Sequence, residues 1–181
     1  FKMKKNNKYS YVQGTSTTDH GSRTYEIQGA RLPSVTTILA KTKDDQYIRQ
    51  WRQKVGYDEA TRIKNRSSLR GSAMHKFIEK HIKEFGYEDL TPIGQEAKSM
   101  AQKIIEIGLT PITHYYGSEI TLHYPGLYAG ATDLVCEHNG MDTIIDFKQA
   151  NRPKQREWID DYFLQIAAYA MAHDHVYGST I

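Results

Sequence analysis

The chain has 181 residues, 39% of them hydrophobic and 25% charged, which is enough for one soluble globular domain with a sizeable core. No apolar stretch approaches the roughly 20 residues that span a bilayer, so we expect no transmembrane helix and no membrane partner. The single cysteine, Cys136, excludes an internal disulfide and a four-cysteine zinc or iron–sulfur site.

The net charge of +3 combines two halves of opposite sign. Residues 1–80 contain 17 Lys and Arg against 7 Asp and Glu, whereas residues 81–181 contain 7 against 14. A basic half suits a polyanionic partner, and an acidic half suits a bound cation. A solvated basic face without any partner explains the charge equally well.

In chain order, the first predicted elements are a small hairpin and a series of helices. Residues 8–13 and 23–28 alternate like strands, and the polar segment 14–22 would join them. Ser34 and Thr91 are expected N-caps, the second followed by proline at the first helical position. Helices are expected from Ser34, over 44–55, over 57–66, over 71–85 and over 91–107.

The hydrophobic period then changes from helical to alternating. Ile112–Tyr124, Leu127–Glu137 and Met141–Lys148 predict an antiparallel meander, whose second turn is Asn139-Gly140, and 156–173 predict an amphipathic helix. No repeat or clear boundary divides the chain. We therefore expect an α+β protein of one domain, 1–181, with a hairpin (1–30), a basic helical part (31–110) and a sheet with its closing helix (111–181).

The tripeptide Asp146-Phe147-Lys148 ends the third predicted strand. Because side chains alternate along a strand, Asp146 and Lys148 should share one face while Phe147 enters the core. A second acid, Asp133, ends the segment Tyr128-Ala129-Gly130-Ala131-Thr132-Asp133 on the preceding predicted strand. Two carboxylates and a lysine on neighbouring strands are the groups that metal-assisted phosphodiester hydrolysis requires. For the tripeptide alone, a surface ion pair on an edge strand is the alternative.

Mg²⁺ prefers oxygen ligands, which Asp133, Asp146 and the carbonyl group of Phe147 could supply. Lys148 would hold or activate the attacking water and stabilise the developing negative charge. Glu119 lies on the first predicted strand, and alternation leaves open whether it faces solvent or this site.

Other polar residues have both a functional and a structural interpretation. His75 follows Arg70 and Gly71 at the start of a predicted helix, which is a basic setting that contains a glycine. A lone histidine on a helix is nevertheless usually structural or exposed. Gln165 and Tyr169 share a helix face with Tyr162, where either a buried hydrogen-bonded contact or a contact to phosphate or base is possible. Arg152 and Lys154, with Arg156, could bind phosphate or could be ordinary surface charge.

Five motifs occur in one order: Arg70-Gly71-x-x-x-His75, Glu119, Gly130-x-x-Asp133, Asp146-Phe147-Lys148 and Gln165-x-x-x-Tyr169. Over roughly residues 32–170, this order resembles the PD-(D/E)xK nuclease superfamily. The likeness is to its RecB-type exonuclease branch, with the mitochondrial genome maintenance exonucleases and their phage relatives. Thr132 stands where the superfamily name has proline, and Gln149 stands where a small hydroxyl residue is often found.

The resemblance implies a single nuclease domain with a restriction-endonuclease-like α-β-β-β-α core and N-terminal helices, which needs Mg²⁺ or Mn²⁺ and hydrolyses DNA, often from single-stranded ends. It makes Asp133 and Asp146 metal ligands and Lys148 catalytic, with His75 and Glu119 supporting the metal. Gln165 and Tyr169 would organise the site or contact DNA, and Arg70 would contact DNA with the basic helices.

Two other functions remain possible: a structure-selective endonuclease of the same fold, and a nucleic-acid-binding module that has lost catalysis. A metalloprotease is disfavoured, because no zinc-ligand spacing occurs. We expect an intracellular protein, in the host cytoplasm if it comes from a phage or bacterium and in mitochondria if it is eukaryotic. The chain begins with Phe1, so its termini are expected to be incomplete. Its protein partners, polarity and strand preference cannot be read from the sequence.

Overall fold

The computed structural model describes residues 2–181 and has the expected α+β class, with five α-helices and two β-sheets in that range. The chain falls into two compact units. The sheet unit comprises the residues up to Lys41 and Thr110–Ile181, and the helical unit comprises Thr42–Leu109. That residues 1–181 form one nuclease domain stays a prediction.

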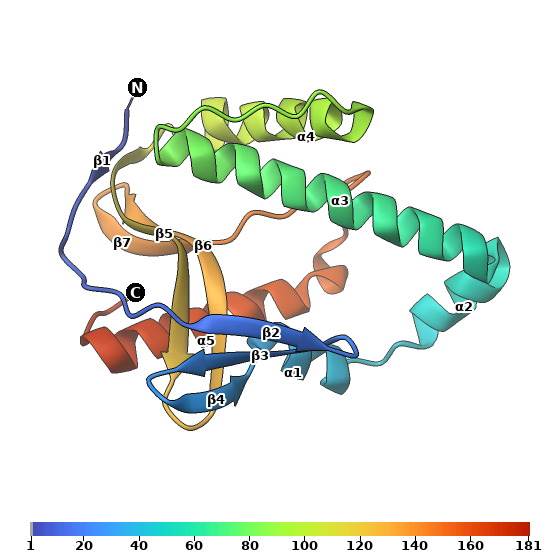
Figure 1. Cartoon of the computed structure of the whole chain (residues 1–181), viewed down its shortest axis with the longest axis horizontal. Helices are drawn as coiled ribbons and strands as arrows, with labels where there is room; N and C mark the ends of the chain where they lie inside the picture. Colours follow the sequence, from blue (N-terminus) through green and yellow to red (C-terminus); the bar gives the residue numbers. More distant parts are fainter. Residues whose placement is uncertain (1) are drawn as a thin grey trace. The chain divides into compact units, whose positions relative to one another are not determined.

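The main sheet of the sheet unit has the strand order β1-β5-β6-β7 (Figure 1). The predicted meander is confirmed as β5 (Ile112–Tyr124), β6 (Tyr128–His138) and β7 (Met141–Ile145), all antiparallel. Asn139 and Gly140 both have positive φ, 49° and 79°, as a type I′ hairpin turn requires. A short strand, β1 (Lys4–Lys5), pairs in parallel with β5 and was not predicted.

The small second sheet corrects the predicted hairpin. It consists of β2 (Thr15–Asp19), β3 (Ser22–Ile27) and β4 (Ala30–Pro33), so the first strand lies in the segment predicted to be a connection. Every residue of β2 is exposed, and a strand with no buried face gives no alternating pattern. Residues 8–13 form no strand; their apolar pattern comes from Tyr9 and Tyr11, which pack against the core of the sheet unit.

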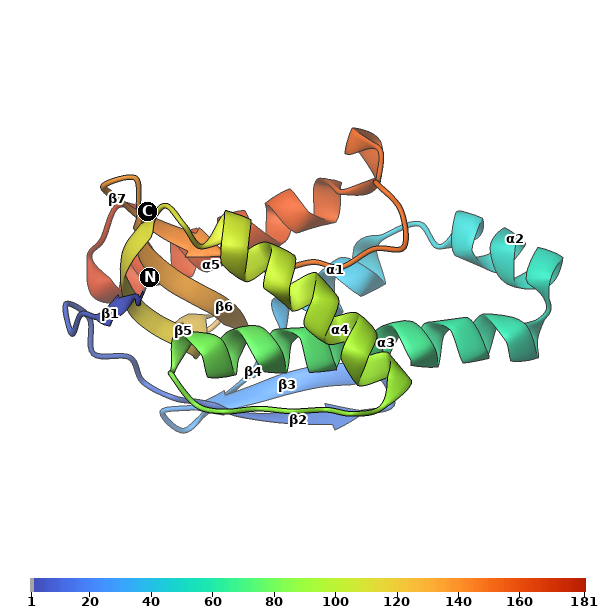
Figure 2. The ribbon, with the colours of Figure 1, turned by 90° about the horizontal axis from the view of Figure 1, so that it is seen from above.

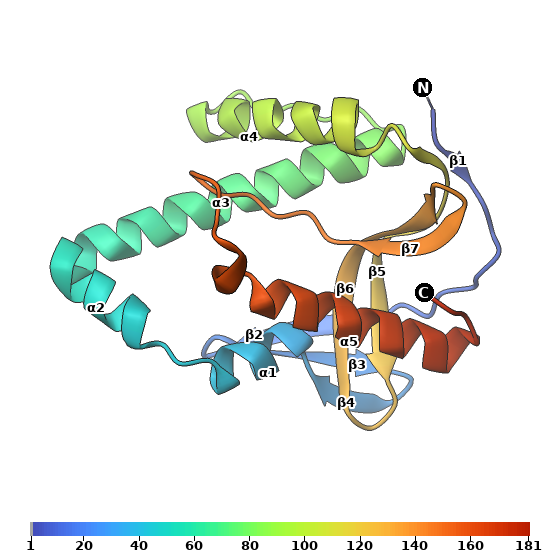
Figure 3. The ribbon, with the colours of Figure 1, turned by 180° about the vertical axis from the view of Figure 1, so that it is seen from behind.

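Helix α5 (Asp160–Tyr177) and the small sheet both pack against the main sheet. On one face, α5 crosses β5 and β6 (Figure 3). The larger hydrophobic core of the sheet unit consists of Val35, Tyr116, Ile120, Leu122, Val135, Ile144, Tyr169 and Ala172. A smaller core joins the small sheet to Ala129 of β6 through Tyr25, Ile27 and Leu32.

Local capping explains where the helices of the sheet unit begin and end. The backbone N–H of Thr37 donates to Ser34 Oγ over 3.0 Å, so Ser34 is the predicted N-cap of α1 (Val35–Thr42). The last helix was expected over 156–173. The chain instead forms a 3₁₀ turn, η2 (Arg156–Trp158), and then α5, which ends at Gly178 in the left-handed conformation (φ 66°).

The helical unit contains α2 (Gln46–Val55), α3 (Tyr57–Ile82) and α4 (Pro92–Lys103), with a π-helical turn, η1 (Ile104–Gly108), directly after α4. Helix α2 ends at Val55 as predicted but begins at Gln46, two residues after the predicted start. The Thr91 cap of α4 is as predicted, because Thr91 Oγ1 accepts from the Gly94 N–H over 3.0 Å. The division of 57–85 into two helices was wrong, because α3 continues through Gly71. A glycine inside a helix costs only about 1 kcal/mol, which the packing of α3 against α4 can offset (Figure 2). Among residues 2–181, no helix has both the length and the apolarity needed to cross a bilayer.

Candidate functional site

Asp146-Phe147-Lys148 lies directly after β7, which ends at Ile145. The prediction that the strand continues to Lys148 was therefore wrong. The expected distribution of side chains nevertheless holds, because Phe147 is buried and the Lys148 ammonium lies 2.5 Å from Asp146 Oδ2. The Asp146 side chain is only 7% exposed, and that of Lys148 is 36% exposed, so the ion pair is partly shielded from water.

A side chain explains why strand pairing stops here. The last register pair of β6 and β7 is Leu134 with Ile145. Beyond it, the backbone N–H of Phe147 donates to Asp133 Oδ2 over 2.6 Å. A carboxylate thus accepts the N–H that a backbone carbonyl would accept in a ladder, and a charged acceptor makes the bond stronger than a neutral one. The loop after β7 is thereby fixed to the buried Asp133.

Glu119 lies opposite Asp133, because Ser118 pairs with Leu134 and Ile120 pairs with Thr132. A carboxylate oxygen of Glu119 and one of Asp133 lie within 4.8 Å of each other. Of the two orientations that the sequence left open, the structure therefore has Glu119 beside Asp133. Two carboxylates this close repel each other unless a proton or a cation lies between them.

Glu119 also has an unusual backbone for a strand residue, with φ of +53°. A glutamate in the left-handed region is strained, and such strain collects where a side chain must be aimed for function. Sequence patterns do not reveal this conformation, since glycine and asparagine are the residues that normally signal it.

Helix α5 holds Lys148 through two buried side chains. The Lys148 ammonium donates to Gln165 Oε1 over 2.9 Å, and Gln165 Nε2 donates to the Tyr169 hydroxyl over 3.0 Å. For Gln165 and Tyr169, the structure thus has the buried hydrogen-bonded contact that was one of two interpretations. Burial raises the pKa of Tyr169, so its hydroxyl stays protonated over the physiological range.

Gly130 has a role that sequence analysis did not assign. A Cβ atom at this position would lie 2.5 Å from Cε1 and 2.9 Å from the hydroxyl oxygen of Tyr169. The missing side chain therefore makes room for the ring that orients Gln165. The spacing of Gly130 and Asp133 on one strand was visible in the sequence, but the contact of Gly130 with Tyr169 on α5 was not.

The segment between β7 and α5 carries the predicted phosphate contacts. Arg152 is exposed there. The Lys154 ammonium donates to the Tyr162 hydroxyl over 2.7 Å, and both Lys154 Nζ and Lys148 Nζ lie 5.1 Å from the centre of the Tyr162 ring. Lys154 is therefore near Lys148, and Tyr162 connects the two.

The remaining predicted residues belong to the helical unit, on α3. Arg70 is buried, and its Nη1 atom lies 3.5 Å from Glu96 Oε2 on α4. His75 is partly exposed, five residues further along the helix. The roles assigned to Arg70 and His75 stay predictions, as do the catalytic, metal-binding and DNA-binding roles of the sheet-unit residues. Those brought together in the sheet unit are Glu119, Asp133, Asp146, Phe147, Lys148, Gln165 and Tyr169.

Comparison with known proteins gives a distant match, while no family model matches the chain. The chain is similar to a nuclease. Over 159 residues it is 28% identical to mitochondrial genome maintenance exonuclease 1 of Mus musculus, which covers 82% of this chain and 46% of that protein. The chain thus spans about half the length of this curated relative. The match is a likeness to a protein named as an exonuclease, and a fold by itself does not indicate an activity.

Proposed function

We propose that this chain is a metal-dependent deoxyribonuclease of the PD-(D/E)xK type that hydrolyses phosphodiester bonds from single-stranded DNA ends. One observation carries the proposal: Lys148, held by Asp146 and Gln165, follows a strand end that is bonded to Asp133, whose carboxylate lies beside that of Glu119. The distant likeness to a protein named as an exonuclease supports the same activity.

The carboxylates fit a divalent cation of the Mg²⁺ or Mn²⁺ kind. Such cations take oxygen ligands from one or two carboxylates and retain several waters, and Glu119 and Asp133 present two carboxylate oxygens within 4.8 Å of each other. We propose Asp133, Asp146 and Glu119 as ligands, with the carbonyl group of Phe147, and His75 as the contribution of the helical unit. Once bound, the cation would neutralise phosphate charge and lower the pKa of a water.

Lys148 is proposed to orient the attacking water and to stabilise the negative charge that develops on the phosphate. Its ammonium is kept close to Asp146 by a 2.5 Å ion pair, and Gln165 fixes its direction. A preorganised charge of this kind costs no reorganisation when the reaction occurs. Gln165 and Tyr169 therefore act through Lys148.

DNA contacts are proposed at two places. Arg152 and Lys154 are exposed in the segment after Lys148, where they can bind the phosphates that flank the scissile bond. Arg70 is the proposed contact on α3, and its ion pair with Glu96 sets the direction of its guanidinium.

The proposal is tested with end-labelled linear single-stranded DNA beside the same DNA as a closed circle, each with Mg²⁺, with Mn²⁺ or with EDTA. An exonuclease digests only the linear form and only with a metal, and labels at the two ends then give the polarity. Cutting of the circle would favour the endonuclease instead. DNA binding without cutting under any metal condition would favour the inactive binding module.

A further inference from the structure

Tyr162 lies in the first turn of α5, at one end of a row of polar side chains on the same face of that helix. The row continues with Gln165 and Tyr169, which are 6% and 2% exposed, whereas Tyr162 is half-buried. Tyr169 holds Gln165, and Gln165 holds Lys148, so both buried members of the row act on partners within the protein. Tyr162 is the member that borders solvent, and none of the roles proposed above belongs to it.

Two lysines from the segment after β7 meet the Tyr162 side chain. The Lys148 ammonium lies 5.1 Å from the centre of the ring, and the Lys154 ammonium lies 5.1 Å from it as well. Lys154 Nζ is also only 2.7 Å from the hydroxyl oxygen, so it lies beyond the hydroxyl group and not over the face of the ring. One ring therefore fixes an exposed lysine beside the lysine proposed to be catalytic.

The hydrogen bond at Tyr162 leaves donors for an outside ligand. The hydroxyl oxygen accepts from Lys154, and no residue within 2–181 accepts the hydroxyl hydrogen. An ammonium group has three N–H donors, of which Lys154 gives one to Tyr162. A hydroxyl and an ammonium group that touch each other and retain donors match the oxygens of a single phosphate, and the charge of the phosphate strengthens both bonds.

The charge of Lys154 is not neutralised by the part of the chain that the structure describes. No carboxylate of residues 2–181 pairs with it, whereas Lys148 pairs with Asp146 and Arg156 pairs with Asp160. An anion that approaches Lys154 therefore displaces no carboxylate. It gains the attraction of an exposed cation without the cost of breaking an existing ion pair.

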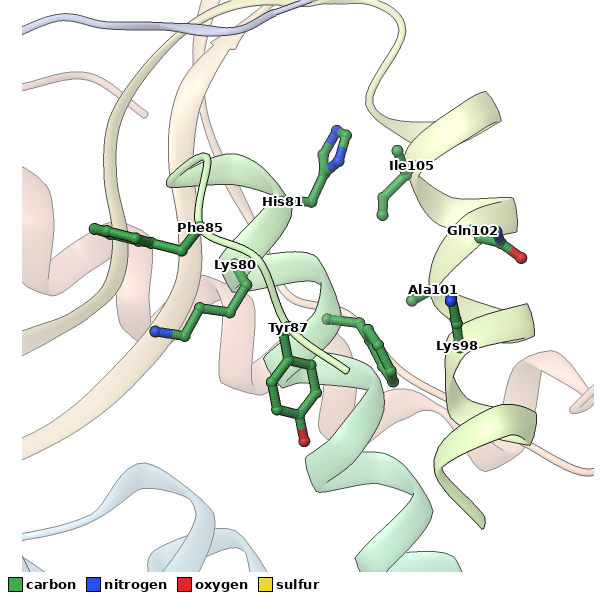
Figure 4. Close-up of a pocket in the computed structure, with 9 residues that line it drawn as sticks. Lys80, His81, Phe85, Tyr87, Lys98, Ala101, Gln102 and Ile105 are labelled. Carbon is green, nitrogen blue, oxygen red and sulfur yellow. The ribbon is translucent and has the colours of Figure 1, made fainter. Parts of the chain in front are cut away.

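Another group of basic side chains lies in the helical unit, beside the pocket between α3 and α4 (Figure 4). It includes Lys80, His81 and Lys98. Figure 4 shows the Lys80 ammonium directed away from Lys98, so these two charges do not point at one ligand. Lys154 and Tyr162 differ, because their polar atoms are 2.7 Å apart and offer donors at the same place.

We propose that the Tyr162 hydroxyl and the Lys154 ammonium together bind one phosphate of the DNA strand, the phosphate that adjoins the one attacked beside Lys148. The hydroxyl hydrogen and an N–H of the ammonium donate to its oxygens, and the Tyr162 ring keeps it at a fixed distance from Lys148. A phosphate contact positions the strand whatever its base sequence. The inference deepens the proposed function and rests on it, because it assigns a further phosphate to the same site.

The test measures binding of the full chain to a labelled single-stranded oligonucleotide in EDTA, so that no result depends on cleavage. Affinity is measured at several salt concentrations, because each phosphate contact with a single strand adds about −0.7 to the slope of log affinity against log salt. Lys154→Ala is expected to bind about tenfold more weakly and to make this slope less steep by about 0.7.

Tyr162→Phe keeps the ring and removes only the hydroxyl group. It should also bind about tenfold more weakly, because a hydrogen bond to a charged group is lost. Each donor orients the other on the same phosphate, so the two changes should not be additive. The double variant should bind no more than about twofold more weakly than Lys154→Ala alone.

Tyr115→Phe and Lys4→Ala are the matched controls. Tyr115 is another half-buried tyrosine with a lysine ammonium, that of Lys5, 5.3 Å from the centre of its ring. Lys4 is an exposed lysine of the sheet unit. Both variants should bind like the wild type at every salt concentration, and thermal melting shows that each variant is folded.

Three results would overturn the proposal: a salt slope that Lys154→Ala leaves unchanged, binding by Tyr162→Phe as tight as that by Tyr115→Phe, or full additivity of the Tyr162 and Lys154 changes. Its failure differs from failure of the proposed function. Metal-dependent cleavage without these losses of affinity refutes only the phosphate contact, and the losses without cleavage refute only the nuclease.

Discussion

The ammonium group of Lys148 donates a hydrogen bond to the side-chain oxygen of Gln165, 2.9 Å away. Helix α5 therefore fixes the position of this lysine in the loop that follows β7. Gln165 is in turn held by the Tyr169 hydroxyl over 3.0 Å. The lysine proposed to be catalytic therefore depends on a buried amide whose own orientation is set by a second buried group.

Replacement of Gln165 by leucine should lower kcat by about tenfold or more with little change in KM, because a misplaced catalytic group slows the chemical step. The variant should also lose about 1–3 kcal/mol of stability, since the Tyr169 hydroxyl is left buried without this partner. Single-turnover cleavage and thermal melting measure the two effects. Gln155→Leu changes an exposed glutamine and is the control; wild-type turnover in Gln165→Leu would contradict this role.

Gly130→Ala should reduce both stability and cleavage, because its Cβ would lie 2.5 Å from the Tyr169 ring. Inserting a methyl group into a packed core costs about 1–3 kcal/mol, and the displaced ring would disturb Gln165. Gly86→Ala is the matched control, as nothing lies within 4 Å of a Cβ built there. Equal melting temperatures for the two variants would show that the ring has room to move.

Glu119 offers a way to separate strain from function. Glycine adopts a φ of +53° without cost, whereas alanine retains the strain, which is roughly 1–2 kcal/mol in the left-handed region. We expect Glu119→Gly to be more stable than Glu119→Ala in chemical denaturation, while both lose metal-dependent cleavage. If Glu119→Ala is the more stable of the two, the backbone is not strained at this residue.

Some of this site follows from the sequence and some does not. The order of strands and helices, and the shared face of Gln165 and Tyr169, follow from hydrophobic period. The end of β7 does not, because the Phe147 N–H is taken by the side chain of Asp133, a contact between residues 14 positions apart. The alternation of apolar and polar residues along a strand does not show where a side chain takes the place of a backbone carbonyl of the neighbouring strand.

The same limit applies to the first 30 residues. Strand β2 is exposed along its whole length and is held by pairing with β3, so no burial pattern marks it. Tyr9 and Tyr11 gave a strand-like pattern instead, because they pack individually against the core. The left-handed backbone of Glu119 and the space beside Gly130 are likewise set by tertiary neighbours, which one sequence does not reveal.

The lowered pKa of Asp142 predicts that the folded protein loses stability at low pH. Burial alone would raise the pKa of this carboxyl group, but hydrogen bonds from Lys8, Tyr116 and Tyr9 outweigh burial and lower the pKa from 3.8 to about 2. A depressed pKa in the folded state adds stability above the unfolded value, and this contribution is lost as the pH falls through the folded value. Asp142 should therefore contribute fully above pH 4 and lose its contribution as the pH falls towards 2.

Melting temperature as a function of pH measures this contribution, with Asp142→Asn as the variant. It should be less stable than the wild type above pH 4, and the difference should shrink as the pH approaches 2. Asp160→Asn, an exposed change, serves as the control. A difference that does not depend on pH would mean that the hydrogen bonds to Asp142 do not depend on its charge.

The most direct test of the proposed site is the rate at which Asp146→Asn digests linear single-stranded DNA with Mg²⁺, measured beside the wild type and Asp160→Asn. Its DNA affinity in EDTA is measured in parallel. The substitution keeps the shape of the side chain but removes the charge that pairs with Lys148 and would bind the cation. The site predicts loss of cleavage with unchanged DNA binding. Digestion by Asp146→Asn at the wild-type rate would contradict it.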